Sequence, residues 1–296
     1  MLGEAAMGLK ILHFGDVHLP FPEGARRTLA VLHPKRLPAL LNFALRRGRK
    51  YADGERKLEA LHEFARREAV DWIVYTGDSV NMGLASEFVH AGTKIASVLR
   101  EAKKGAMATP GNHDLYAPGS ERGFRRWMDF GTENDWPEAE AKGEGWPKVR
   151  FLDAESVLVG LNTARPHWAF WNSSGGISAA QLEALERVLD DPAVAGRKYI
   201  LLATHYPLDE AGAFHGMRGT ERLMRVLAGR KGISILHGHN HHAYRRVLPG
   251  TDIPLYCCGS LTKEGDESCR LYELFGGGLN ARIARWRNAR FVVDGD

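Results

Sequence analysis

Five short, mostly apolar segments of this sequence each lead into residues that can bind a metal ion. Apolar runs of this length, bounded by turn formers, are typical of buried strands. In open α/β sheets the carboxyl ends of the strands assemble the site, so the pattern predicts an α/β chain whose strands deliver these side chains to one place. The segments are 9–14, 72–75, 105–109, 199–203 and 233–236, and the residues that follow them are Asp16 and His18, Asp78, Asn112 and His113, His205, and His239 and His241.

The stretches between these predicted strands show the spacing of helices. In segment 55–68, apolar residues recur at helical spacing and predict a helix with one buried face. Ser178 is a preferred N-cap residue, and Gln181 is at the position that completes a capping box. Further elements are predicted as helices over 85–102, 121–130, 178–189 and 220–228, strands over 148–152 and 156–163, and a meandering half-sheet over 244–293.

The composition is that of a globular protein with a large core. The chain has 296 residues, of which 44% are hydrophobic and 26% charged, and we find no linker, internal repeat or low-complexity tract. We therefore expect one domain over 1–296, with a loop-rich insertion at about 115–147. The three cysteines are too few for a disulfide framework. With neither a signal peptide nor a membrane span in the sequence, we expect a cytoplasmic protein.

A basic stretch over residues 24–52 is predicted to be an amphipathic insertion. It contains eight basic and no acidic residues, although the net charge of the chain is only +4. Pro38 suits the first turn of a helix, and apolar residues at helical spacing give this helix an apolar face. Two interpretations are open: a surface helix docked on the core, or a segment that binds an anionic membrane surface or a phosphate-bearing ligand. The apolar residues are Leu37, Leu40, Leu41, Ala44 and Leu45.

The segment Gly111-Asn112-His113-Asp114 combines an amide, an imidazole and a carboxylate after a Pro-Gly turn. Asn112 can offer a neutral oxygen to a cation, His113 can carry a proton near neutral pH, and Asp114 can hold the imidazole in one tautomer. These residue types also form turns for backbone reasons alone. Because four other predicted strand ends carry similar residues, we favour a composite metal site over a turn or a set of core histidines.

Taken together, the motifs resemble those of the calcineurin-like metallophosphoesterases. The signature blocks of that family are Asp-x-His, Gly-Asp, Gly-Asn-His-Asp/Glu, His and Gly-His-x-His, in this order. All five blocks are complete here, within residues 16–241, and one departure is Ser79, where the family usually has an apolar residue. The blocks read Asp16-Val17-His18, Gly77-Asp78, Gly111-Asn112-His113-Asp114, His205 and Gly238-His239-Asn240-His241.

This resemblance implies a four-layer fold, with two mixed sheets packed face to face and helices on either side, and two metal ions at the strand ends. It assigns Asp16, His18 and His241 to one metal and Asn112, His205 and His239 to the second, with Asp78 between them. His113 is then not a ligand, and we expect it, oriented by Asp114, to protonate the leaving oxygen or stabilise charge on it. The mixed nitrogen and oxygen ligands suit Mn, Fe or Zn.

The ligand inventory also predicts a reaction. Two divalent cations about 3.5 to 4 Å apart can generate a bridging hydroxide at neutral pH and allow in-line attack on phosphorus. The sequence is similar to the bacterial branch of the family, which includes cyclic-nucleotide phosphodiesterases and UDP-2,3-diacylglucosamine hydrolases. The segment 35–51 resembles a basic, apolar insertion of the latter enzymes.

We therefore predict a phosphodiesterase or pyrophosphatase with two metal ions, acting on a lipid- or nucleotide-linked phosphate at the inner membrane face. The alternatives are a soluble cyclic-nucleotide phosphodiesterase, a nuclease, and a metal-binding scaffold without catalysis. The mild net charge of +4 argues against a nucleic-acid partner, and the complete ligand set argues against the scaffold. His215, in a glycine-rich loop, and the pair Asn162 and Arg165 are further candidates for substrate contact.

Overall fold

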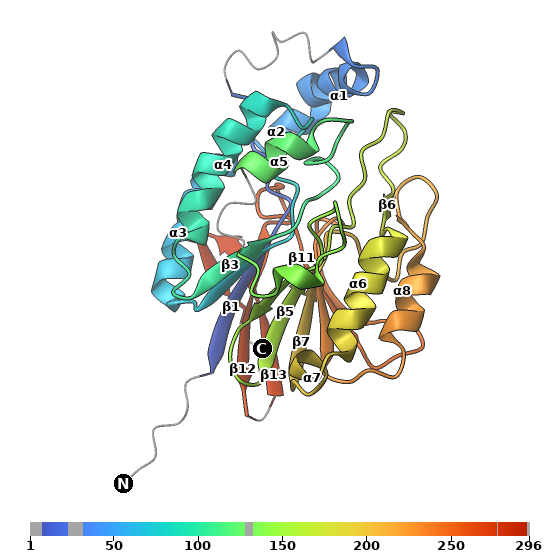
Figure 1. Ribbon diagram of the computed structural model, residues 1–296. Helices are drawn as coiled ribbons and strands as arrows, with labels where there is room; N and C mark the ends of the chain where they lie inside the picture. The colour runs from blue at the N-terminus through green and yellow to red at the C-terminus, as the bar shows by residue number, and fades with distance from the viewer. Residues whose placement is uncertain (1–7, 23–31, 128–132, 277, 295–296) are drawn as a thin grey trace.

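Two six-stranded sheets pack face to face, and helices cover the outer face of each, as the computed structural model shows (Figure 1). The structure describes residues 8–22, 32–127, 133–276 and 278–294. The first sheet has the order β14-β13-β12-β1-β2-β3 and the second the order β10-β11-β9-β7-β5-β4. Their bounds are β1 Leu9–Phe14, β2 Trp72–Tyr75, β3 Gly105–Ala108, β4 Lys148–Phe151, β5 Ser156–Gly160, β7 Tyr199–Ala203, β9 Ile233–His237, β10 Ala243–Val247, β11 Pro254–Cys258, β12 Ser268–Phe275, β13 Gly278–Arg287 and β14 Arg290–Val293.

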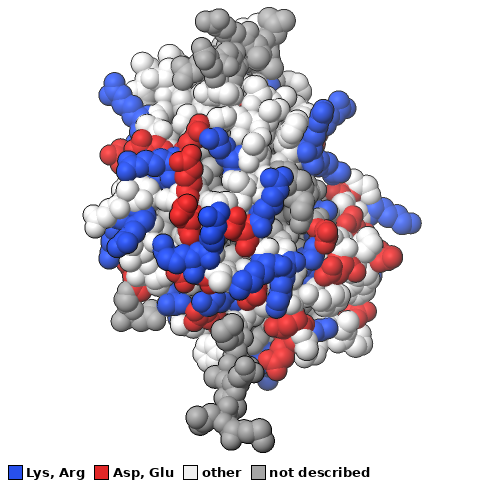
Figure 2. Space-filling view, turned by 90° about the vertical axis from the view of Figure 1, so that its left-hand side faces the viewer, with Lys and Arg blue, Asp and Glu red and all other residues white. Residues whose placement is uncertain are grey.

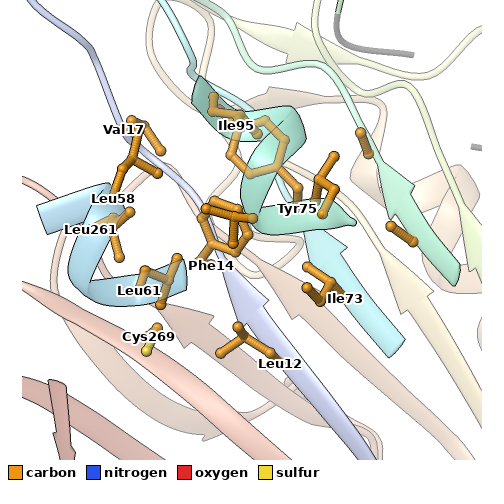
Figure 3. Packing of buried hydrophobic residues seen from close by; sticks show 14 of the residues in the cluster. Leu12, Phe14, Val17, Leu58, Leu61, Ile73, Tyr75, Ile95, Leu261 and Cys269 are labelled. Atoms are coloured by element: carbon orange, nitrogen blue, oxygen red, sulfur yellow. The ribbon is translucent and has the colours of Figure 1, made fainter. Parts of the chain in front are cut away.

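Three apolar clusters hold the four layers together. One lies between the first sheet and helices α3 (Gly54–Glu68) and α4 (Ala85–Leu99), where Leu12, Phe14 and Tyr75 meet Leu58, Leu61 and Ile95 (Figure 3). A second lies between the other sheet and helices α6 (Ala179–Asp190) and α8 (Thr220–Leu227). The third fills the space between the two sheets. The predicted mixed-sheet α/β fold is confirmed.

The parallel strands of each sheet place their carboxyl ends at one edge of the molecule. In the first sheet β1 pairs in parallel with β2, and β2 with β3. In the second, β7 pairs in parallel with β5 and with β9. All five predicted strands that precede metal-type residues belong to these parallel sets, so their following loops come together at the upper end of the view in Figure 1.

The C-terminal part of the chain differs from the expected half-sheet. Strands β10 and β11 join the second sheet beside β9, whereas β12, β13 and β14 join the first sheet beside β1. The prediction of one meander was therefore wrong. Short alternating strands can pair on either sheet, and the sequence pattern does not identify the partner.

The remaining elements show where local signals were sufficient and where they were not. Ser178 caps α6 by accepting a hydrogen bond from the Gln181 amide at 3.0 Å, as predicted. The predicted reciprocal bond is replaced, because the Gln181 side chain bonds the backbone of Asn162 at 2.8 and 2.9 Å. Part of the predicted helix 121–130 lies outside the described residues. The other elements are α5 Glu121–Trp127, a 3₁₀ turn Pro137–Ala139, β6 Gly175–Gly176, α7 Pro192–Ala195 and β8 Met217–Arg218.

The basic segment forms three short consecutive helical pieces: α1 (Arg36–Asn42), a π-helix (Phe43–Arg47) and α2 (Gly48–Lys50). Leu40 is partly buried and packs against a small cluster around Met82 and Tyr116, whereas Leu37, Leu41 and Leu45 are 47%, 62% and 65% exposed and do not face the core. The interpretation that this helix docks on the core through its apolar face is therefore wrong for Leu37, Leu41 and Leu45. The predicted insertion also includes residues 24–31, which lie outside the described part of the chain.

The basic segment is attached to the core through several buried residues, namely Lys35, Arg36, Phe43 and Tyr51. The Arg36 guanidinium donates to the carbonyls of Met82 and Gly83 at 3.0 and 3.3 Å, and to the Ser120 hydroxyl at 3.1 Å. None of the described helices is long and apolar enough to cross a bilayer.

Candidate metal centre

The loops that follow the strands hold their polar residues in an unusual backbone conformation. Asp16, His18, Asp78, His239 and His241 all have positive φ angles, between 41° and 71°. Residues other than glycine rarely adopt this left-handed region. Each such residue costs on the order of 1–3 kcal/mol, and they concentrate at functional sites. Five of the seven predicted ligands therefore carry backbone strain that the surrounding fold maintains.

Two motif glycines allow the loops to approach each other. A Cβ atom on Gly111 would lie 2.1 Å from Asp78 Oδ1, and one on Gly77 would lie 2.2 Å from the Gly111 nitrogen. Any side chain at either position would separate the loop after β2 from the loop after β3. The glycines of the Gly-Asp and Gly-Asn-His-Asp blocks thus set the position of the Asp78 carboxylate.

Four of the predicted ligands form a compact cluster. One ligand atom from each of Asp16, His18, Asp78 and His241 lies within 4.8 Å of all the others. His241 Nε2 lies 3.1 Å from Asp16 Oδ1 and 3.2 Å from His18 Nε2. His18 Nε2 lies 3.5 Å from Asp78 Oδ2. Two carboxylates and two imidazoles of this arrangement are suitable ligands for a divalent transition metal.

The other three predicted ligands converge beside this cluster. Asn112 Oδ1 lies 3.0 Å from His205 Nε2 and 3.1 Å from His239 Nδ1. His205 Nε2 lies 3.6 Å from Asp78 Oδ2, the same carboxylate oxygen that faces His18. Asp78 is therefore adjacent to both groups, which is the position that a ligand shared by two metals requires.

Each histidine of the two groups is oriented through its outer nitrogen. A metal-binding histidine commonly has such a partner, which fixes the tautomer and the orientation of the ring. For His241 this partner is the hydroxyl group of Tyr51, a residue of the basic segment. The sequence did not indicate this contact, because Tyr51 and His241 are 190 positions apart. The contacts are His18 Nδ1 to the Val80 carbonyl (3.2 Å), His205 Nδ1 to the Thr76 carbonyl (2.7 Å), His239 Nε2 to the His215 carbonyl (3.2 Å) and His241 Nδ1 to the Tyr51 hydroxyl (3.3 Å).

The protonation states of these groups suit metal binding. Burial lowers the pKa of His205, and burial and the nearby His205 lower the pKa of His239 to about 3, so both imidazoles are neutral at pH 7. Burial raises the pKa of Asp16, but the imidazoles of His241, His205 and His239 more than offset this and lower it overall. Among the described residues the buried Oδ1 of Asp16 makes no hydrogen bond of regular geometry, although His241 Nε2 lies 3.1 Å away. A cation at this point would satisfy it, so the residues fit a metal.

His113 and Asp114 have separate surroundings. His113 Nδ1 lies 2.6 Å from the Asn81 carbonyl, and its ring contacts His18 edge to face at 4.7 Å. The Asp114 carboxylate instead accepts hydrogen bonds from the backbone amides of Gly111, Asp78 and Ser79, at 2.8 to 2.9 Å. The prediction that Asp114 orients the His113 ring was therefore wrong. Asn81 provides that contact, and Asp114 holds the two loops together.

A cleft of about 440 Å³ opens over these residues. Its wall on one side is formed by α1 and the start of the π-helix, and on the other by the loops around Phe170 and His215. His215, a candidate from sequence, does line the cleft, and so does Lys35 of the predicted basic segment; Tyr116 lines it without having been predicted. Asn162 and Arg165, the other candidates, do not line this cleft. Asn162 has its backbone bound to Gln181 and its side chain to the Ala164 amide, at 3.1 Å, and Arg165 lines a separate hollow with His167 and Arg218.

Comparison with known proteins decides the family. The model of the calcineurin-like phosphoesterase family matches residues 9–243, which is most of the chain. The chain is a calcineurin-like phosphoesterase. The resemblance inferred from the five motifs is thus confirmed, and with it the assignment as a phosphoric ester hydrolase. This family depends on two metal ions, in agreement with the candidate cluster around Asp16, His18, Asp78 and His241.

Solved structures share the fold of this phosphoesterase at low sequence identity. A dimetal phosphatase from Danio rerio matches with a TM-score of 0.62 and 14% identity, covering 97% of this chain and 98% of that one. A purple acid phosphatase from yellow lupin seeds matches with a TM-score of 0.61 and 12% identity, covering 98% of this chain and 53% of that one. The protein TT1561 of Thermus thermophilus gives a TM-score of 0.53 and 12% identity, covering 96% of this chain and 100% of that one. No curated protein sequence matches this chain significantly.

Proposed function

We propose that this phosphoesterase hydrolyses a phosphodiester or diphosphate linkage with two divalent cations of Mn, Fe or Zn. Asp16, His18 and His241 would hold one cation, and Asn112, His205 and His239 the other, with Asp78 between them. The observation that carries this proposal is the position of Asp78 Oδ2, 3.5 Å from His18 Nε2 and 3.6 Å from His205 Nε2.

The cations would supply a nucleophilic water at neutral pH and neutralise phosphoryl oxygens. The protein supplies the proton for the leaving oxygen, and His113 is the candidate because its ring lines the cleft next to His18. With Nδ1 directed to the Asn81 carbonyl, Nε2 is the nitrogen that exchanges the proton. Asp114 acts at a distance from the reaction by fixing the loops that carry His113 and Asp78.

We further propose that the substrate is lipid-linked and is taken up at an anionic membrane surface. Among the described residues, eight of the eleven exposed large hydrophobic side chains belong to three segments that border the cleft. The rings of His33 and Trp168, from two of these segments, stack at 4.9 Å. We call these eight residues the apolar rim: Leu32, Leu37, Leu41, Leu45, Trp168, Phe170, Trp171 and Phe214.

The apolar rim is supported as a lipid-facing surface by its composition. Large exposed apolar patches on soluble proteins mark interaction sites for proteins, membranes or ligands. The basic residues Arg49 and Lys50 are exposed on α2, directly after the leucines. Basic residues beside exposed apolar and aromatic side chains are typical of segments that lie in a membrane interface. The protein would then be peripheral on the inner membrane face.

The charge distribution on the face that carries α3 and α4 gives no support to a nucleic-acid substrate there. Figure 2 shows that basic side chains lie among acidic ones on the face that carries α3 and α4. Several of them are paired there, such as Lys94 with Glu55 at 2.7 Å and Arg66 with Glu101 at 3.4 Å. A nuclease would need a broad basic surface along the nucleic-acid backbone.

Two measurements test the proposal. The first is turnover of bis-p-nitrophenyl phosphate with Mn, Fe, Zn or Co, together with cAMP and a diacyl nucleotide diphosphate sugar. Turnover of simple diesters with any of these metals is expected, and absence of turnover with all of them would exclude the enzyme function. Efficient turnover of cAMP alone would favour the soluble cyclic-nucleotide phosphodiesterase.

The second measurement is flotation with vesicles that contain an anionic phospholipid. The variant Leu37→Gln/Leu41→Gln/Leu45→Gln should bind these vesicles more weakly than the natural protein. A matched control is Val247→Gln, because Val247 is 50% exposed on β10 and is not part of the apolar rim. Equal binding by all three proteins would exclude the membrane part of the proposal and leave the phosphoesterase part intact.

A further inference from the structure

Lys35 is a buried lysine that lines the cleft over the metal centre. It directly precedes α1, and only 2% of its surface is exposed. Its ammonium group lies 4.3 Å above the centre of the Tyr116 ring. That ring stacks on His113 at 5.4 Å, and His113 in turn contacts His18 of the metal centre. Lys35 therefore belongs to the same cleft as the predicted ligands and the predicted proton donor.

Among the residues that the structure describes, no carboxylate pairs with the ammonium group of Lys35, as one normally does with a buried lysine. Within the described ranges of the chain, no carboxylate lies within 4.0 Å of Lys35 Nζ. Lys57 is almost equally buried, at 4%, and its ammonium group lies 2.7 Å from Glu267 and 2.8 Å from the Thr262 carbonyl. An unpaired buried charge is costly. Of these two lysines, Lys57 is thus paired, whereas the charged neighbour of Lys35 within the described part of the chain is another cation, Arg36.

The backbone around Lys35 is held in place, which fixes where the ammonium group can reach. Arg36, the next residue, is bound to three oxygens of the core through its guanidinium. The Tyr116 hydroxyl donates to the Lys35 carbonyl at 3.4 Å. Burial and the nearby Arg36 lower the pKa of Lys35 to about 8, which leaves it mostly protonated at pH 7. An anion that enters the cleft would relieve this unfavourable environment.

We propose that Lys35 binds a second phosphoryl group of the substrate, next to the phosphoryl group held at the metal centre. This inference rests on the proposed function and narrows it, because it requires a diphosphate rather than a substrate with a single phosphoryl group. The ligand atoms of the metal centre hold one phosphoryl group through the cations. Lys35 is a buried cation elsewhere in the same cleft, and it complements a second negative charge on a substrate of this class.

The test compares the binding of two inhibitors to the metal-loaded protein by calorimetry. Methylenediphosphonate carries two linked phosphoryl groups that cannot be hydrolysed, and inorganic phosphate carries one. We expect methylenediphosphonate to bind the natural protein more tightly than phosphate. In Lys35→Met the ratio of the two affinities should fall by at least tenfold, and in Lys35→Arg, which keeps the positive charge, it should fall less.

The control is Lys231→Met, which removes an exposed lysine near the opposite end of β9 from the metal centre and should keep the natural ratio. If Lys35→Met weakens both inhibitors by the same factor, or neither, Lys35 does not recognise a second phosphoryl group. If Lys35→Met loses vesicle binding but keeps the ratio, the anion that Lys35 meets is a lipid headgroup, and the proposal is wrong. Because binding is measured without turnover, these results are distinct from a failure of the proposed function.

Discussion

Glu87 allows a quantitative prediction about the loop that supports the metal centre. Its carboxylate is 2% exposed and accepts hydrogen bonds from the backbone amides of Asn81, Met82 and Leu84, at 2.9, 3.1 and 2.9 Å. Through its backbone oxygens the same loop contacts His113 at Asn81 and Arg36 at Met82. Glu87 thus supports the residues that position both His113 and the segment that carries Lys35.

Burial raises the pKa of Glu87 to about 7 in spite of the three amides. In the unfolded chain a glutamate titrates near 4.3, so between these two values the folded state binds a proton that the unfolded state does not. The stability that this proton contributes is fully present below about pH 4.3 and is lost as the pH rises through about 7. A pKa shift of this size changes the free energy of unfolding by roughly 3 to 4 kcal/mol, at about 1.4 kcal/mol for each pKa unit.

The perturbation is Glu87→Gln, which removes the titrating group and retains one oxygen to accept from the loop amides. Urea unfolding of the metal-free protein, followed by tryptophan fluorescence between pH 4.5 and 7.5, would give the free energy of unfolding of each protein. The free energy of the natural protein minus that of the variant should fall by roughly 3 kcal/mol across this range. Glu63→Gln, at an exposed position on α3, is the control and should show no such trend. A difference that stays constant within about 0.5 kcal/mol would refute the reasoning, because one titrating group with this shift must produce the slope.

Three further predictions concern the metal centre. His113→Ala should keep both metals but lose about a hundred- to ten-thousand-fold in turnover, whereas Asn112→Ala should weaken binding of the second metal. The metal content of both variants is measured by elemental analysis. Equal metal loss in the two variants would contradict these roles. Tyr51→Phe removes the hydroxyl group that lies 3.3 Å from His241 Nδ1. This variant should reduce metal affinity by about 10- to 100-fold, measured by competition with a chelator. Unchanged affinity would show that this contact does not orient His241. Gly111→Ala places a methyl group 2.1 Å from Asp78 Oδ1 and should cost about 1–3 kcal/mol of stability as well as metal affinity; a stable variant with natural metal content would be inconsistent with this close approach.

Local sequence patterns were sufficient for the strands and most of the helices, and they placed Asp16, His18, Asp78 and His241 in what the structure shows as a candidate metal cluster. The five apolar runs became strands, and the first predicted helix buries its expected face through Leu58, Leu61, Phe64 and Ala65. A run of buried residues and a helical period are set by neighbouring residues alone. The side chains of the seven predicted ligands come together because each follows a strand by only a few residues and because parallel strands end at the same edge.

The tertiary structure decided which residues support those ligands and what the basic segment does. Tyr51 meets His241 across 190 positions of sequence, and no local pattern links them. The helical period grouped the apolar residues of this segment on one face, but a period does not say whether a face meets the core or solvent. Leu40 packs against a core cluster, whereas Leu37, Leu41 and Leu45 are exposed. Likewise, the charges of Lys35 and Arg36 are equivalent in the sequence. Only the fold binds Arg36 to three core oxygens and leaves the ammonium group of Lys35 in the cleft, because these environments are built from segments far apart in the chain.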